Sequence, residues 1–128
     1  MRLISLVFGG IVACSSALAN EKTDLIAELQ LTMQRHVDQS LVDGAIQRRD
    51  FETGEVVKYF PIDTHSMVMA LDEDYVLCLD LTTESGSSVP VDFYITETGS
   101  GFRVYQTEIN NREVLENLMK AGRVERVK

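Results

Sequence analysis

The sequence has few of the residues that build disulfide-rich, metal-bound or repetitive folds. Its 128 residues include two cysteines, two histidines, two prolines and no tryptophan. So few cysteines and prolines exclude a disulfide-stapled miniprotein and a collagen-like chain. Positive charge is also scarce, because the formal net charge is −8 at pH 7. Since an acidic surface repels phosphate backbones, we do not expect a nucleic-acid-binding protein.

The first nineteen residues have a composition of their own. Arg2 is the only charged residue among them, and a mostly apolar run of eleven residues covers Leu3–Ala13. Eleven residues rise only about 16 Å as a helix, roughly half the thickness of a membrane's hydrocarbon core, so a secretory signal peptide is predicted. We expect cleavage after Ala19, a single domain at 20–128, and a periplasmic or secreted location.

Cys14 leaves a second route of processing open. The run Ile11–Cys14 resembles a bacterial lipobox, in which the cysteine is lipidated and becomes the N-terminus. A lipid at this position would tether the domain to a membrane surface. Cleavage after Ala19 would instead leave Cys78 as the single cysteine of the mature chain, which permits an intermolecular bridge but no internal disulfide.

The mature chain begins with a predicted amphipathic helix over Thr23–Leu41. Its apolar residues recur at every fourth position and are Leu25, Leu29, Met33 and Val37. This spacing places them on one helix face, which needs an apolar surface to pack against. The helix is expected to end near Gly44, because glycine readily adopts the left-handed conformation that terminates helices.

After this helix the hydrophobic period changes to two, which predicts strands. Turn-forming residues, such as Thr53-Gly54 and Glu73-Asp74, separate six segments. The six segments are Ala45–Glu52, Glu55–Ile62, His65–Asp72, Tyr75–Thr83, Val89–Glu97 and Phe102–Ile109. Their connections are too short for parallel crossovers, so an antiparallel meander is predicted.

A short second helix is predicted near the C-terminus. Asn110 and Glu113 have the spacing of a capping box, and Gly122 marks the expected end. The apolar stripe of this helix is Val114, Leu115, Leu118 and Met119.

The predicted fold class is therefore α+β, with an N-terminal helix on a curved antiparallel meander of about six strands and a short C-terminal helix. This order of elements resembles the cystatin-like α+β roll, an architecture that protease inhibitors share with nuclear transport factor two and its relatives. Cystatins carry a Gln-Val-X-Val-Gly hairpin loop, which this chain lacks. The resemblance thus implies an architecture and no inhibitory activity.

Aligning the strands on their turns assigns each residue to one face of the sheet. We predict Val68 opposite Leu79, Leu79 opposite Phe93, and Ile95 opposite Val104. This inward face is aliphatic and receives the first helix. The other face, called here the outward face, contains His65, Met67, Met69, Leu71, Val76, Cys78, Asp80, Asp92, Tyr94, Thr96, Arg103, Tyr105 and Thr107. A half-apolar face indicates cover by the second helix, by another protein or by a second copy, or a small-molecule pocket.

The outward face also contains candidate polar chemistry. Asp80 is expected opposite Asp92, where two carboxylates could bind a cation, share a proton, pair with Arg103 or lean apart into water. Asp63 lies two residues before His65 and could orient its imidazole as a base, but no nucleophile accompanies them.

The other titratable residues offer no metal or cofactor motif. His36, beside the apolar stripe of the first helix, is interpreted as a packing or surface residue. Two distant histidines and one mature cysteine do not have zinc-ligand spacing, so neither a metal nor a cofactor is expected.

These patterns predict a non-enzymatic exported protein that binds an unknown partner protein or a second copy of itself. The contact residues expected on the outward face are Met67, Met69, Cys78, Tyr94 and Tyr105, and the polar set beside them is His65, Asp80, Asp92 and Arg103. One alternative is a small-ligand site between the first helix and the sheet. Another is a small hydrolase or isomerase that uses His65, which the aliphatic inward face disfavours.

Overall fold

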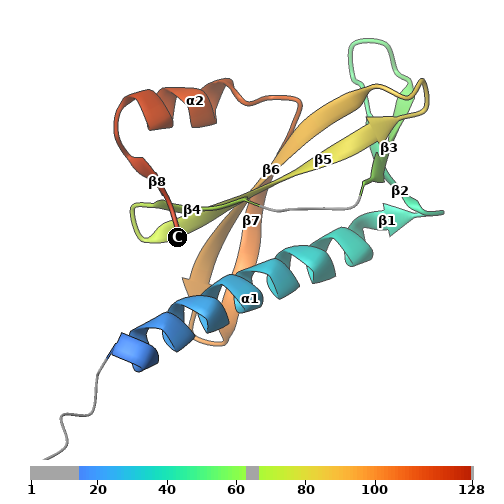
Figure 1. Ribbon diagram of the computed structural model, residues 1–128. Helices are drawn as coiled ribbons and strands as arrows, with labels where there is room; N and C mark the ends of the chain where they lie inside the picture. Colours follow the sequence, from blue (N-terminus) through green and yellow to red (C-terminus); the bar gives the residue numbers. More distant parts are fainter. Residues whose placement is uncertain (1–14, 63–66, 128) are drawn as a thin grey trace, which may run out of the picture.

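The computed structural model describes residues 15–62 and 67–127, and side chains from Asn20 onward. The elements are α1 (Ser15–Ser40), β1 (Leu41–Val42), β2 (Ala45–Arg49), β3 (Val56–Pro61), β4 (Met67–Leu71), β5 (Asp74–Thr83), β6 (Ser88–Thr98), β7 (Gly101–Ile109), α2 (Glu113–Lys120) and β8 (Val124–Arg126). Figure 1 shows three layers, with α1 on one face of the antiparallel sheet and α2 on the other. The α+β class with an N-terminal and a short C-terminal helix is confirmed. Among the described residues, neither helix is long and apolar enough to cross a membrane, and Cys14 lies outside them.

Helix α1 buries the stripe that its sequence predicts. Leu29, Met33 and Val37 are almost fully buried, whereas Leu31, on the opposite side, is half exposed. The helix begins at Ser15 rather than at Thr23.

Strand β5 organises the sheet because it pairs along both of its edges. One edge pairs with β6 from Tyr75 to Thr82. The other edge pairs first with β4 and then with β3, which lie one after the other along it. The predicted meander is therefore wrong at this point, since β3 and β4 both pair with β5. One feature fits this arrangement: β5 is ten residues long and can pair with β4 and β3 at different positions along one edge.

The β4–β5 and β5–β6 registers differ from prediction by two residues. Val68 lies opposite Leu77 rather than Leu79, and Phe93 also lies opposite Leu77. A shift of two residues changes the partner of each side chain but keeps its face. The predicted inward and outward sets therefore survive on these strands, although individual pairs do not.

A β-bulge alters the register between β6 and β7. Ile95 pairs with Val104, as predicted, but the register shifts between Tyr94 and Ile95. Beyond this bulge, Phe93 pairs with Thr107. The assignment of Thr107 to the outward face is thus wrong, because one extra residue in a strand exchanges the faces that follow it.

Two apolar clusters hold the layers together. The first core cluster lies between α1 and the sheet and consists of Leu29, Met33, Val37, Ile46, Val68, Leu77, Leu79, Leu81, Val91, Phe93 and Ile95. The second core cluster lies beneath α2 and consists of Met69, Leu71, Val76, Tyr94 and Leu115. Helix α2 therefore covers part of the outward face, which was one of the predicted forms of cover.

The C-terminal segment departs from prediction at both of its ends. Helix α2 is capped by Arg112 without a side-chain hydrogen bond, and Asn110 lies before it with a φ of 51°. The predicted capping box is therefore wrong. After the helix, β8 pairs with β4 in an antiparallel register. This three-residue strand is too short for a periodic signal and was missed.

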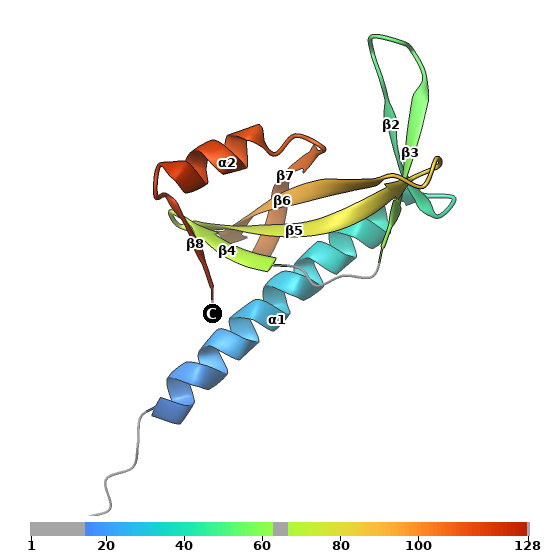
Figure 2. The ribbon, with the colours of Figure 1, turned by 45° about the horizontal axis from the view of Figure 1, so that its top comes forward.

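Strands β2 and β3 form a hairpin that stands away from the rest of the sheet (Figure 2). Its connection is longer than the predicted two-residue turn, because β2 ends at Arg49 and β3 begins at Val56. Asp50 closes this connection: its N–H donates to the carbonyl of Glu55, and its carbonyl accepts from the N–H of Gly54, both at 2.7 Å.

Candidate functional site

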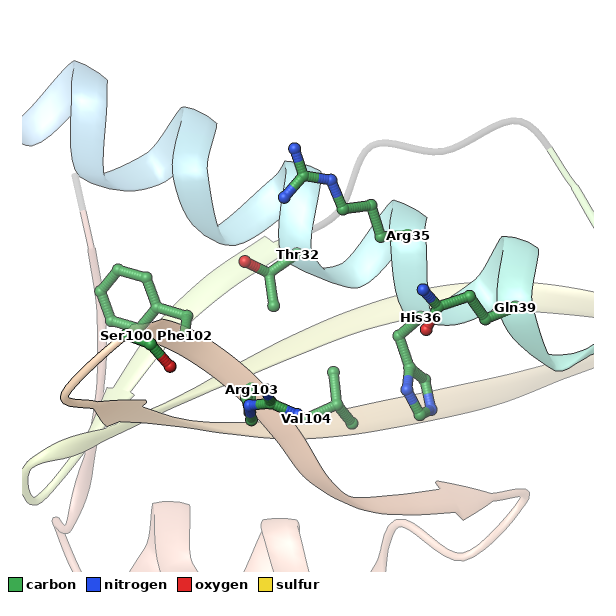
Figure 3. Close-up of a pocket in the computed structure, with 8 residues that line it drawn as sticks. All are labelled: Thr32, Arg35, His36, Gln39, Ser100, Phe102, Arg103 and Val104. Carbon is green, nitrogen blue, oxygen red and sulfur yellow. The ribbon is translucent and has the colours of Figure 1, made fainter.

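A pocket of about 320 Å³ opens between α1 and β7, and is called here the α1–β7 pocket. It is lined by Thr32, Arg35, His36 and Gln39 of α1 and by Ser100, Phe102, Arg103 and Val104 at the start of β7. Figure 3 shows Phe102 and Val104 extending from β7 toward α1, and His36 extending from α1 toward the strand. Six of the eight residues are polar or charged, so the pocket differs from the aliphatic inward face that the sequence predicted beneath the first helix.

Local structure explains how these residues meet. Arg35 and His36 lie three and four positions after Thr32, and Gln39 lies four and three positions after them, so the four residues share one side of the helix beside the buried stripe. On β7, Phe102 and Val104 pack against the first core cluster and fix the strand beneath the helix. A well-packed apolar layer thus supports a polar pocket at the edge of the sheet.

His36 forms part of the inner wall of the pocket. Its ring contacts Phe93 edge-to-face, with the ring centroids 5.7 Å apart. Its Nε2 lies 3.4 Å from the hydroxyl oxygen of Thr107, at the long end of hydrogen-bond distance. Burial lowers the pKa of His36 from its ordinary value of 6.5, so the imidazole is neutral at pH 7.

Two arginines are among the residues that line the pocket. Arg35 comes from α1 and Arg103 from β7. Within the described part of the chain, the salt bridges are Lys58–Glu84, Arg112–Asp92 and Arg123–Asp72, and none of them involves Arg35 or Arg103. The Arg35 guanidinium therefore keeps its N–H donors available for a ligand, in a molecule whose net charge is −8. Arg103 lies between Phe102 and Val104, which pack on the α1 side, so its side chain projects to the opposite face of the sheet.

The predicted contact residues do not form one open surface. Met69 and Tyr94 are buried in the second core cluster beneath Leu115, whereas Met67 and Tyr105 remain exposed and Cys78 is half-buried. Parts of this surface are thus already occupied by α2 of the same chain.

Tyr105 is held in place by a hydrogen bond. Its hydroxyl donates to Asp74 Oδ2 at 2.9 Å, and burial together with this bond raises the pKa of Tyr105 to about 12.

The predicted polar set is dispersed. Asp80 lies opposite Pro90 and Asp92 lies opposite Cys78, so the expected Asp80–Asp92 pair is wrong because of the two-residue register difference. Arg103 lines the α1–β7 pocket. Asp63 and His65 lie outside the described residues.

Asp92 instead forms a salt bridge with Arg112, the residue just before α2. It is 1% exposed, and its carboxylate accepts hydrogen bonds from Arg112 Nη2 at 2.9 Å and Arg112 Nε at 3.4 Å. Burial, followed by a hydrogen bond with Asp92, raises the pKa of the neighbouring Cys78 thiol. The thiol is therefore protonated and a poor nucleophile at neutral pH. This cluster joins α2 to the sheet.

Sequence reasoning missed most of the pocket. Thr32, Arg35 and Gln39 lie beside the apolar stripe of α1, and this spacing is the signal that could have grouped them with His36. Within the described residues, no group of three or more histidine, cysteine, aspartate or glutamate side chains could hold a metal ion. No protein-family model, curated protein or solved structure matches the chain.

Proposed function

We propose that the protein is an exported, non-enzymatic binding protein whose α1–β7 pocket takes a small anionic ligand. The observation that carries this proposal is Arg35, which lines a mostly polar pocket without an ion-pair partner among the described residues. The signal-peptide pattern of residues 1–19 supports export. The helix packed across an antiparallel sheet supports the cystatin-like roll as the description of the architecture.

The chemistry of the pocket favours binding over catalysis. Hydrogen bonds between a guanidinium and an oxyanion are short, and each is roughly twice as strong as a neutral hydrogen bond. Thr32, Gln39 and Ser100 add neutral hydrogen-bonding groups. The eight lining residues include no carboxylate and no thiol, so the set supplies donors for an anion rather than an acid and a nucleophile.

Thermal unfolding with matched charged and neutral ligands tests this proposal. Acetate and succinate, at constant ionic strength, are expected to raise the melting temperature, whereas acetamide and succinamide leave it unchanged. A ligand that binds only the folded state at about 100 times its Kd stabilises by about 2.7 kcal/mol.

Variants localise the effect to the pocket. The variant Arg35→Gln should lose the response to anions, while Arg48→Gln, which removes a charge from the exposed hairpin, should retain it. Equal responses of Arg35→Gln and the parent protein would contradict the proposal.

One observation favours self-association as a second candidate function. Phe51 is 92% exposed at the end of the β2–β3 hairpin, which stands away from the sheet (Figure 2). An aromatic side chain so exposed is a natural contact for a second copy. Sedimentation velocity over a range of concentrations should show a dimer that Phe51→Ser removes, and a monomer at every concentration would exclude this candidate.

A further inference from the structure

We infer that the free edge of β7 pairs with the β7 edge of a second copy of this chain, in an antiparallel register whose two-fold axis passes between Tyr105 and Gln106. The two sheets would then continue into each other. This interface goes beyond the anion-binding pocket and does not depend on it, and it is separate from the contact at Phe51. Three features lead to it: an open edge, the spacing of the backbone groups along that edge, and two charged side chains.

Strand β7 forms an open edge of the sheet. Among the described residues it pairs with β6 alone, and it is nine residues long without a proline. The side chains of β6 that face α1, Val91, Phe93 and Ile95, are at most 1% exposed, whereas Val104 and Ile109 beside them on β7 stay partly exposed. An added strand would complete the cover of these apolar side chains and bind the unpaired backbone groups of the edge.

Two hydrogen bonds establish which backbone groups point to this edge. The N–H of Thr83 donates to the carbonyl of Ser87 at 2.9 Å, and the N–H of Asn110 donates to the carbonyl of Pro90 at 2.8 Å. Backbone groups alternate between the two edges of a strand, so the odd-numbered residues of β6 bind β5 and the even-numbered ones bind β7. Their partners on β7 are Gly101, Arg103, Gln106 and Glu108. The backbone groups that point to the free edge therefore belong to Phe102, Val104, Thr107 and Ile109.

The β-bulge makes this edge complementary to itself. Tyr105 is the extra residue of the bulge, so the edge-directed residues are two positions apart on each side of it but three apart across it, between Val104 and Thr107. A regular strand has edge-directed groups at every second residue and can stay in phase with only one half of β7. A second β7, antiparallel and with its own bulge opposite, stays in phase on both sides. The bulge thus favours a second copy over an unrelated strand.

This register also matches the side chains on the face that α1 covers. Val104 of one copy would lie opposite Thr107 of the other, and Phe102 opposite Ile109. All four side chains lie on this face, because three of them pack against the first core cluster and Thr107 contacts His36 of α1. Without the bulge, these pairings would join residues from opposite faces.

On the outward face, the same register places opposite charges together. Arg103 of one copy would lie opposite Glu108 of the other, and the two-fold axis repeats the pair. Neither residue belongs to a salt bridge in the described part of the chain. The carboxylate of Glu108 accepts hydrogen bonds from the side-chain amides of Gln106 at 2.7 Å and Asn111 at 3.0 Å, which are neutral. Opposite charges directly across an antiparallel pair are stabilising, and like charges there are destabilising.

Charge exchange followed by sedimentation velocity over a range of concentrations tests the inference. The parent is expected to dimerise. Arg103→Glu and Glu108→Arg each place like charges opposite each other twice, so each should weaken the dimer at least about tenfold, or about 1.4 kcal/mol. An equimolar mixture of the two single variants restores opposite charges at both positions and should dimerise about as tightly as the parent. The double variant should do the same.

Controls and a backbone measurement accompany this test. Arg48→Glu and Phe51→Ser change the β2–β3 hairpin and should leave the dimer intact, and circular dichroism compares the folds of all variants. In the parent, the amide protons of Val104 and Thr107 should exchange more slowly as the protein concentration rises. Those of Arg103 and Glu108 should not change, because their backbone groups already bind β6.

Several results would overturn the inference. They are a parent that stays monomeric at every concentration, a dimer that persists in both charge variants, and a dimer that Phe51→Ser removes. A mixture that stays monomeric although both variants keep the parent's circular dichroism spectrum would also overturn it. If a charge variant fails to fold, the parent's amide exchange decides: exchange at Val104 and Thr107 that is independent of concentration contradicts the inference. None of these results bears on anion binding at Arg35, which the thermal-unfolding experiment tests separately.

Discussion

The ion pair between Asp92 and Arg112 gives a quantitative prediction about the attachment of α2. Asp92 is 1% exposed, while the Arg112 side chain is 37% exposed. Arg112→Met removes both hydrogen bonds and leaves a buried carboxylate without a counter-ion. Removal of one partner from a buried pair costs about 3–5 kcal/mol. Because water can reach the partly exposed position of Arg112, we expect the lower end, about 3 kcal/mol in the free energy of unfolding.

A double-mutant cycle measures this interaction. Urea unfolding at pH 7, followed by circular dichroism, would compare the parent with Arg112→Met, Asp92→Asn and the double variant. Asp92→Asn removes the buried charge, so it should cost less than Arg112→Met, about 1–2 kcal/mol. The double variant should then be more stable than the sum of the single effects predicts. A cost below about 1 kcal/mol for Arg112→Met, or additive single effects, would refute the reasoning.

Three further predictions concern other parts of the molecule. Leu115→Ala removes the buried side chain of α2 and should lower the free energy of unfolding by about 2–3 kcal/mol. The amide protons of Glu113–Lys120 should then exchange faster with solvent, and unchanged exchange rates would contradict this. The Cys78 thiol, whose pKa is raised by burial, should react with iodoacetamide at pH 8 far more slowly in the folded protein than in urea, and equal rates would contradict this. Because burial lowers the pKa of His36 below 6.5, the unfolded chain binds more protons, so the free energy of unfolding should decrease as the pH falls through 6.5. His36→Gln should make that pH dependence shallower, and an unchanged slope would contradict it.

The residues with strong periodic signals were predicted well. The stripe of Leu29, Met33 and Val37 is buried as its spacing implies, and the pair Ile95–Val104 has the predicted register. These features depend on local alternation, which one stretch of sequence contains in full.

Features that depend on contacts between distant segments were not predicted. The β-bulge at the register shift between Tyr94 and Ile95 has no local sequence signal. It nevertheless moves Thr107 to the face of the sheet that α1 covers, beside His36. The pairing of both β3 and β4 with one edge of β5 is a contact between separate segments, so no single stretch of sequence encodes it. The choice of Arg112 as the partner of Asp92 depends on how the chain turns after β7.

The candidate pocket also depends on contacts between distant segments. Arg35 and Ser100 are sixty-five positions apart in the sequence and line one pocket only because α1 lies along β7. Neither residue has a neighbour in the sequence that marks it as a ligand-binding group. The placement of the helix on the sheet was therefore required before these two residues could be recognised as parts of one site.

The most direct test of the account is a ¹H–¹⁵N spectrum of the arginine side-chain Nε–H groups recorded while succinate is added. The Arg35 signal is expected to shift and to saturate with one Kd, while the Arg48 signal stays in place. If both signals drift equally, or if Arg35 does not respond, the α1–β7 pocket is not an anion-binding site.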